Sequence, residues 1–134
     1  MKTRHKFLEK FYSHTSFPHQ YELSKDRKKR FKKIKRKYGI DIRECWNMDV
    51  SFYAWLYEHL CMYEKYTIAD IDDARAVFTY NGKTYTQRQL MHKLKKRLTT
   101  YFKSAEETDI SEKKQKKIDE IIPIWQVLMP AMWW

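Results

Sequence analysis

Lysine and arginine side chains are concentrated in one short stretch, residues 25–37, which reads KDRKKRFKKIKRK. Ten of its thirteen residues are cations and only Asp26 is acidic. Like charges three or four residues apart on a helix repel one another, so such a surface is easier to explain if an anion neutralises it. Nucleic-acid phosphates are such an anion, and lysine meets them as a point charge. The candidate anion-binding residues are Lys25, Arg27, Lys28, Lys29, Arg30, Lys32, Lys33, Lys35, Arg36 and Lys37.

The net charge of +11 lies in the first part of the chain. Residues 1–39 carry 14 Lys and Arg against 3 Asp and Glu, whereas residues 40–134 carry 14 of each. This asymmetry indicates a polyanionic partner, either RNA or DNA or a nucleoprotein complex. An acidic protein surface is an alternative, and a membrane fits less well because the stretch lacks a broad apolar face. The charge divides the chain into a basic helical segment, 1–39, and a charge-balanced helical domain, 40–134.

A second cationic stretch covers residues 88–103, which hold six Lys and Arg and no acid. Lys93, Lys96 and Arg97 are further candidates for contact with nucleic acid. We expect them to contribute less than the first stretch, because the acidic residues at 106, 107 and 109 can offset their charge. Lysine dominates both stretches, and contacts to phosphates carry no sequence information, so we expect low sequence specificity.

Residue patterns that support catalysis are missing from the sequence. Two glycines leave no material for a phosphate-cradling loop, and no nucleophile elbow is present. Arg88 and His92 resemble the Arg/His pair of helical ribonucleases, but their spacing is shorter, and a solvated helix residue is the simpler interpretation of His92. The acids at 70, 72 and 73 are interpreted as a solvated loop. We therefore predict no enzyme activity, catalytic residue, metal, cofactor or small-molecule substrate.

The most apolar stretch must supply the core. Residues 49–65 are apolar on nearly all sides of a helix, with Phe52, Trp55, Leu56, His59, Leu60 and Tyr63 on one face. They are predicted to form the central helix of a compact helical bundle. Asn81-Gly82 between aromatic and threonine residues predicts one short β-hairpin over 78–85. The predicted fold class is therefore mainly α.

The remaining helices follow from capping and apolar spacing. A helix over 24–38 is predicted to end at Gly39. A second helix, from Thr86 to about Lys103, is predicted to bury one stripe made of Leu90, Leu94, Leu98, Tyr101 and Phe102. A last helix, capped near residue 109, is expected to break or kink at Pro123. Residues 2–12 are predicted to form a weak amphipathic helix. Cys45 and Cys61 lie in apolar surroundings and are predicted to be buried free thiols in a reducing compartment.

The run from Gly39 to Asp49, GIDIRECWNMD, resembles a motif of small uncharacterised tailed-bacteriophage proteins, Gly-x6-Trp-Asn-Leu-Asp. Met48 replaces the leucine, and residues 119–125 are similar to the later acidic-apolar segment of that family. The resemblance implies a phage accessory protein in the bacterial host cytoplasm. Three functions stay open. The protein binds nucleic acid or a nucleoprotein, inhibits a host defence nuclease such as a CRISPR effector, or is a virion structural protein that contacts DNA.

Overall fold

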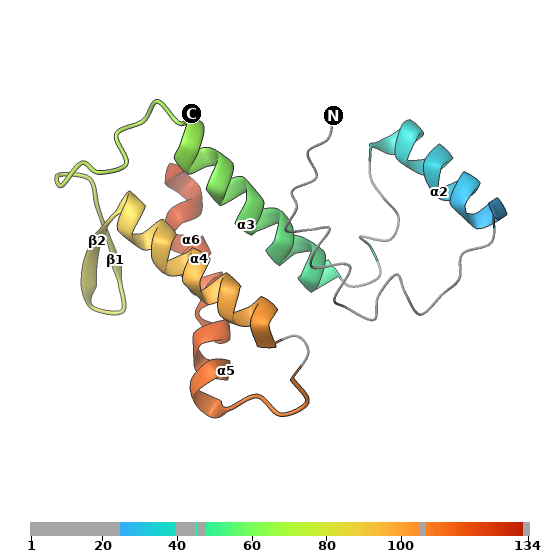
Figure 1. The fold of residues 1–134 in the computed structure, drawn as a ribbon. Helices are drawn as coiled ribbons and strands as arrows, with labels where there is room; N and C mark the ends of the chain where they lie inside the picture. Colours follow the sequence, from blue (N-terminus) through green and yellow to red (C-terminus); the bar gives the residue numbers. More distant parts are fainter. Residues whose placement is uncertain (1–24, 40–44, 46–47, 105–106, 133–134) are drawn as a thin grey trace. The chain divides into compact units, whose positions relative to one another are not determined.

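The computed structural model describes residues 25–39, 45, 48–104 and 107–132. Helices dominate these residues, and the strands among them form one antiparallel hairpin (Figure 1). The prediction of a mainly α fold with one short hairpin is confirmed. Contacts along the chain define two compact units, Met1–Leu56 and Tyr57–Trp134, which divide within α3 (Met48–Tyr66). The predicted helix over 2–12 and most of the Gly39–Asp49 motif lie outside the described residues.

Helix α2 (Lys25–Tyr38) has the bounds that the sequence predicts. Gly39 follows it with φ +75° and donates its N–H to the carbonyl of Lys35 at 2.8 Å. A residue in this left-handed conformation ends a helix at little cost only if it is glycine. Phe31 and Ile34 are partly covered, whereas Tyr38, expected beside them, is exposed.

Helix α3 is buried on two opposite sides and exposed between them. Ala54 and Leu56 are buried, and so are Glu58 and Leu60. The sequence predicted that Trp55 shares a buried face with Leu56 and Leu60. This prediction is wrong in part, since the side chain of Trp55 is 46% exposed. At 100° per residue the exposed apolar side chains and His59 fall on one stripe between the two buried sides, whereas the exposed Asp49 and Lys65 lie outside it. This stripe comprises Met48, Phe52, Trp55, His59, Met62 and Tyr66.

The hairpin pairs β1 (Val77–Tyr80) with β2 (Lys83–Thr86). Its two turn residues are Asn81, with φ 52°, and Gly82, with φ 76°. Positive φ at both positions is the geometry of the two-residue turn that matches strand twist, so the predicted hairpin is confirmed. In this antiparallel register, Tyr80 pairs with Lys83 on either side of the turn.

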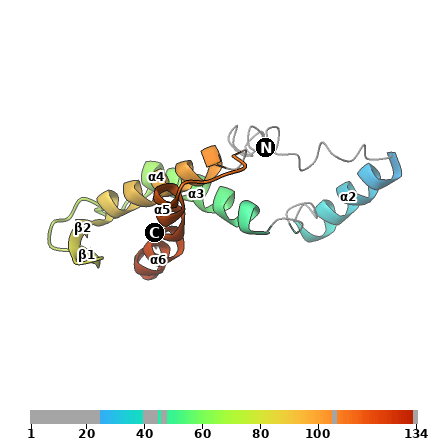
Figure 2. The same ribbon diagram turned by 90° about the horizontal axis from the view of Figure 1, so that it is seen from below.

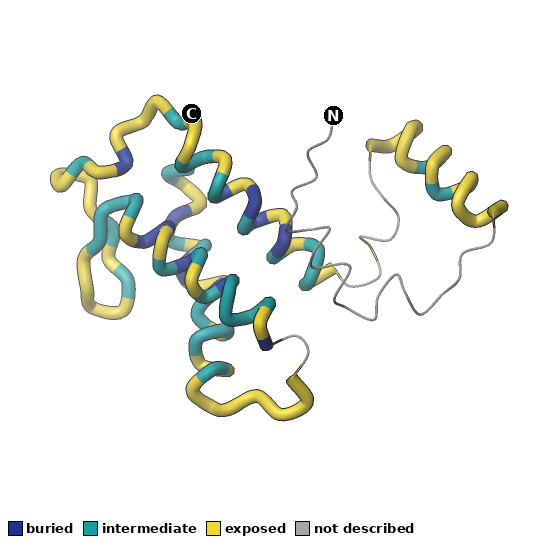
Figure 3. Tube along the Cα trace, viewed as in Figure 1, coloured by how far each residue is buried: buried dark blue, intermediate teal, exposed yellow. Residues whose placement is uncertain are grey.

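Helix α4 (Gln87–Ser104) has more buried residues than any other helix described within residues 57–134. It packs against α5 (Glu112–Asp119), α6 (Ile121–Leu128) and both strands (Figures 1 and 2). Buried positions recur along α4 (Figure 3). Of its predicted stripe, Leu90, Leu94 and Leu98 are fully buried, whereas Tyr101 and Phe102 are only partly covered, so the prediction is wrong for these two. The other buried apolar residues described within residues 57–134 are Leu60, Ile71, Met91, Ile121, Ile124 and Leu128.

The C-terminal helix is interrupted, as the sequence predicts, but at Glu120 rather than at Pro123. Ser111, not residue 109, caps α5, since its Oγ accepts a hydrogen bond from the N–H of Lys114 at 3.3 Å. The break places Pro123 in the first turn of α6, where N–H groups have no partner within the helix, so its missing donor costs nothing there. A short 3₁₀ helix, η2 (Met129–Ala131), follows.

The described helices include no segment both long and apolar enough to cross a bilayer.

Candidate anion-binding surfaces

The first candidate surface is α2 itself. All ten predicted cations of this helix are exposed, because the two partly covered side chains, Phe31 and Ile34, take up only one narrow side. Lys37 places its Nζ 5.0 Å from the ring centre of Tyr38. Apart from Arg27, none of these cations forms an ion pair with a carboxylate of the described residues. The helix therefore presents a cationic surface that its own acidic residue, Asp26, does not neutralise.

The second candidate surface is an open groove within residues 57–134, which we call the α4–α5 groove. It has a volume of about 540 Å³. Its walls are Tyr57, His92, Lys95, Lys96, Arg97, Thr99, Thr100, Lys103 and Lys117. Six of these nine residues carry basic side chains and none is acidic.

The three cations predicted on this second stretch have different surroundings. Lys96 is exposed and lines the groove, whereas Lys93 is partly covered, with its Nζ 5.9 Å from the ring centre of Tyr85. Arg97 is only 17% exposed and donates from Nε to Glu120 Oε2 at 2.8 Å. Glu107, expected to offset these charges, pairs instead with Lys114.

Lys103 and Lys117 line the groove but are not among the binding residues predicted from the sequence. Lys103 lies seven residues after Lys96, two turns further along α4, so a helical-wheel argument could have grouped them. Lys117 comes from α5, and no local pattern connects it to α4. Within the part of the chain that the structure describes, neither these two lysines nor Lys96 pairs with a carboxylate.

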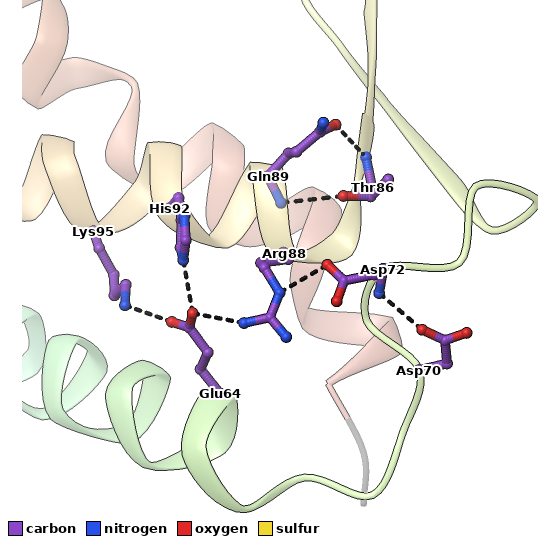
Figure 4. A network of polar contacts seen from close by, with 8 residues as sticks. All are labelled: Glu64, Asp70, Asp72, Thr86, Arg88, Gln89, His92 and Lys95. Atoms are coloured by element: carbon purple, nitrogen blue, oxygen red, sulfur yellow. Dashed lines mark hydrogen bonds and ion pairs between the residues drawn. The ribbon is translucent and has the colours of Figure 1, made fainter.

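A separate polar network surrounds the carboxylate of Glu64 at the C-terminal end of α3 (Figure 4). Its Oε1 accepts from Arg88 Nη1 at 2.9 Å and lies 2.7 Å from His92 Nε2. Its Oε2 accepts from Lys95 Nζ at 2.6 Å. Since a carboxylate can only accept, Nε2 of His92 carries the proton. The Arg88 and His92 pair noted in the sequence therefore meets on one acid from a different helix.

The electrostatics of Glu64 follow from this crowding. Burial alone raises the pKa of Glu64, whose side chain is 18% exposed. Hydrogen bonds and positive charge from Lys95 and His92 outweigh burial and lower the pKa to about 2. The carboxylate is therefore ionised at any ordinary pH and holds the end of α3 to α4.

The loop over residues 67–76 contributes the remaining contacts. Asp72 Oδ1 accepts from Arg88 Nε at 2.7 Å, and Arg88 N donates to the carbonyl of Ile71 at 2.9 Å. Asp70 and Asp73 each accept a hydrogen bond from a backbone N–H two residues ahead, at Asp72 and Arg75 respectively. These acids hold the loop in shape. The described residues contain no group of three His, Cys, Asp or Glu placed to hold a metal ion.

Both cysteines are free thiols, but their predicted burial is wrong for Cys45, which is exposed, and incomplete for Cys61. Burial raises the pKa of the Cys61 thiol, and it also raises the pKa of Tyr57, one turn earlier on α3.

Comparison of the chain with protein-family models, with curated proteins and with solved structures found no match.

Proposed function

We propose that this chain is a non-enzymatic nucleic-acid-binding protein, a phage accessory protein acting in the bacterial cytoplasm, and that α2 is its main binding surface. The observation that supports this most is the exposure of all ten cations of α2. A helix of this composition is costly to maintain alone, because neighbours at i,i+4 repel. Bound phosphates remove that repulsion and release condensed counterions, which favours binding.

The partner on this proposal is RNA or DNA, free or within a nucleoprotein complex. Besides its lysines and arginines, α2 has only Phe31, Ile34 and Tyr38 as large side chains. Its cations therefore contact the phosphate backbone rather than base edges. Binding should therefore be alike for unrelated sequences and fall steeply with salt.

The test is a salt titration of binding to labelled single-stranded RNA by the full chain and by a five-site variant. The variant changes these residues to Gln: Lys28, Lys29, Lys32, Lys33 and Arg36. For about 4–6 phosphate contacts through α2, we expect this helix to contribute roughly −3 to −4 to the log–log salt slope of the wild type. The variant should have a flatter slope and bind more weakly.

A charge-matched control separates contact from net charge. It changes five cations of residues 57–134 that line neither candidate surface to Gln: Lys65, Lys83, Lys113, Lys114 and Lys116. The control should keep most of the wild-type slope. If the α2 variant binds as tightly as the control, with the same slope, then α2 is only a solvated helix and the proposal is wrong.

One stoichiometric protein captured from host cells, with no bulk nucleic acid, would instead favour an inhibitor of a host nuclease. Presence in purified virions would favour a structural protein that contacts DNA.

A further inference from the structure

We propose that the α4–α5 groove is a second nucleic-acid site, which binds the phosphates of a single strand through Lys96, Lys103 and Lys117 independently of α2. This inference rests on the proposed function and adds a site to it. The groove brings side chains from two helices to one surface, although residues 96 and 117 are 21 positions apart in the sequence.

The charge of the groove is divided between its members. Lys95 and His92 are engaged by Glu64, at 2.6 and 2.7 Å, and Arg97 is engaged by Glu120 at 2.8 Å. These pairs fix the surrounding walls and neutralise part of their charge. Lys96, Lys103 and Lys117 have no such carboxylate among the residues described. They are the three ammonium groups left to meet an external anion.

No acidic side chain lines the groove, so no carboxylate of the lining repels a bound anion. The hydroxyls of Thr99 and Thr100 donate to the carbonyls of Lys95 and Lys96 at 2.9 and 3.1 Å. Their hydrogens are committed within the helix, so recognition depends on the lysines. A ligand that binds here is therefore selected by charge and by the spacing of its charges.

The spacing favours a chain of anions over a single one. Lys96 and Lys103 are seven residues apart on α4, which separates their Cα atoms by about 10 Å along the helix axis. Successive phosphates of a nucleic-acid strand can occupy positions spaced along such a row. Lys117 approaches from α5 on the other wall.

The aromatic wall favours a nucleic acid over an acidic peptide. Tyr57 lines the groove, and its ring is held edge-on to that of Phe102, with 6.3 Å between ring centres. Cationic grooves that contain aromatic rings are the usual sites for single strands, whose bases stack on them. The groove volume of about 540 Å³ can hold parts of a base, a sugar and a phosphate of one strand together. It is far too small for a duplex.

The experiment uses the full chain and a fluorescein-labelled oligouridylate, with binding measured by anisotropy across a salt series. The groove variant changes Lys96, Lys103 and Lys117 to Gln. Its matched control changes Lys65, Lys83 and Lys116, which lie outside the groove, and so removes the same charge. Losing three contacts to a single strand should flatten the log–log salt slope by about 2 in the groove variant. The control should change the slope by much less.

The same comparison is repeated in the five-site α2 variant. If the groove acts independently, the groove substitutions flatten the slope there as well, by a similar amount. The groove site would be overturned if the groove variant and its control had equal log–log salt slopes, both in the wild-type chain and in the five-site α2 variant. Failure of the α2 proposal has a different signature, namely an unchanged slope on mutating α2 while the groove variant still shows its loss.

An oligoglutamate with the same number of charges competes against the oligouridylate. We expect it to displace the RNA at least tenfold less effectively. Equal or better displacement, lost in the groove variant, would assign the groove to an acidic protein and overturn the nucleic-acid assignment.

Discussion

The carboxylate of Glu64 connects the end of α3 to α4 and, through Arg88, to the loop over residues 67–76. It is the meeting point of Arg88, His92 and Lys95 from α4, and Arg88 extends the network to Asp72 in the following loop. Three charge-assisted hydrogen bonds to one acid hold the end of α3 and residues 67–76 against the start of α4. Replacing this residue should therefore affect stability rather than binding.

Glu64→Gln is expected to lower the free energy of unfolding by about 1–3 kcal/mol, because it leaves Arg88, His92 and Lys95 without their shared charge partner. Chemical denaturation at neutral pH measures this. The control is Glu107→Gln, which breaks a more exposed pair with Lys114 and should change stability by less than about 0.5 kcal/mol.

Acid titration of the same variant gives a second readout. The pKa of Glu64 is lowered from 4.5 to about 2 in the folded protein, so its contribution to stability is complete above pH 4.5. That contribution is lost as the pH falls from 4.5 towards 2, because protonation removes the charge that the cations bind. Wild type and Glu64→Gln should therefore differ at neutral pH and converge near pH 2. A constant difference across this range would contradict the assignment.

At the scale of elements, α4 is the helix on which residues 57–134 depend. It contacts α5, α6 and both strands, and it begins with a reciprocal cap (Figure 4). Thr86 N donates to Gln89 Oε1 at 2.9 Å, and Gln89 N donates to Thr86 Oγ1 at 3.3 Å. The cap fixes the corner between β2 and α4, so the hairpin and the helix start together.

Leu94→Ala should cost about 2–5 kcal/mol, because Leu94 is fully buried in α4 and its loss leaves a cavity. The matched control is Ile68→Ala, since Ile68 is 83% exposed and should change stability by less than about 0.5 kcal/mol. Thermal unfolding of both variants tests the assignment. Similar shifts in melting temperature would mean that α4 is not the core helix of this unit.

At the scale of the whole molecule, the charge and the packing are divided differently along the chain. The positive excess lies in residues 1–39, whereas compact packing divides the chain at Leu56 and Tyr57. The chain thus combines a strongly cationic helix with a separate helical unit, residues 57–134, that carries a cationic groove. Both surfaces are candidates for binding an anion.

The full chain is expected to leave labelled RNA and DNA uncleaved, with or without Mg²⁺ or Mn²⁺. The reason is that His92, the only histidine among the described residues that line the groove, contacts Glu64, as do Arg88 and Lys95. Gel analysis of the products tests this, with His92→Gln as the matched variant. Cleavage that follows the protein through purification and disappears in His92→Gln would show that the pair of Arg88 and His92 is catalytic.

The sequence by itself determined the features that depend on neighbours along the chain. Apolar spacing located Leu90, Leu94 and Leu98, the Thr86–Gln89 pair marked the start of α4, and Asn81-Gly82 marked the hairpin turn. Each of these depends on local backbone geometry, which residue type fixes within a few positions. The ten cations of α2 were identified in the same way, because a helix with so few apolar residues must expose them.

Only the tertiary structure decided which sides of α3 are covered and which cations remain without a partner. Residues 49–65 are apolar almost all round, so periodicity could not separate buried Leu56 from exposed Trp55. Arg97 and Lys96 are neighbours in sequence, yet Arg97 is neutralised by Glu120 from beyond α5 while Lys96 is left to the groove. Lys117 joins that groove from another helix. Such pairings depend on long-range packing, which places charges from distant positions within a few ångströms of one another, and no local pattern encodes that distance.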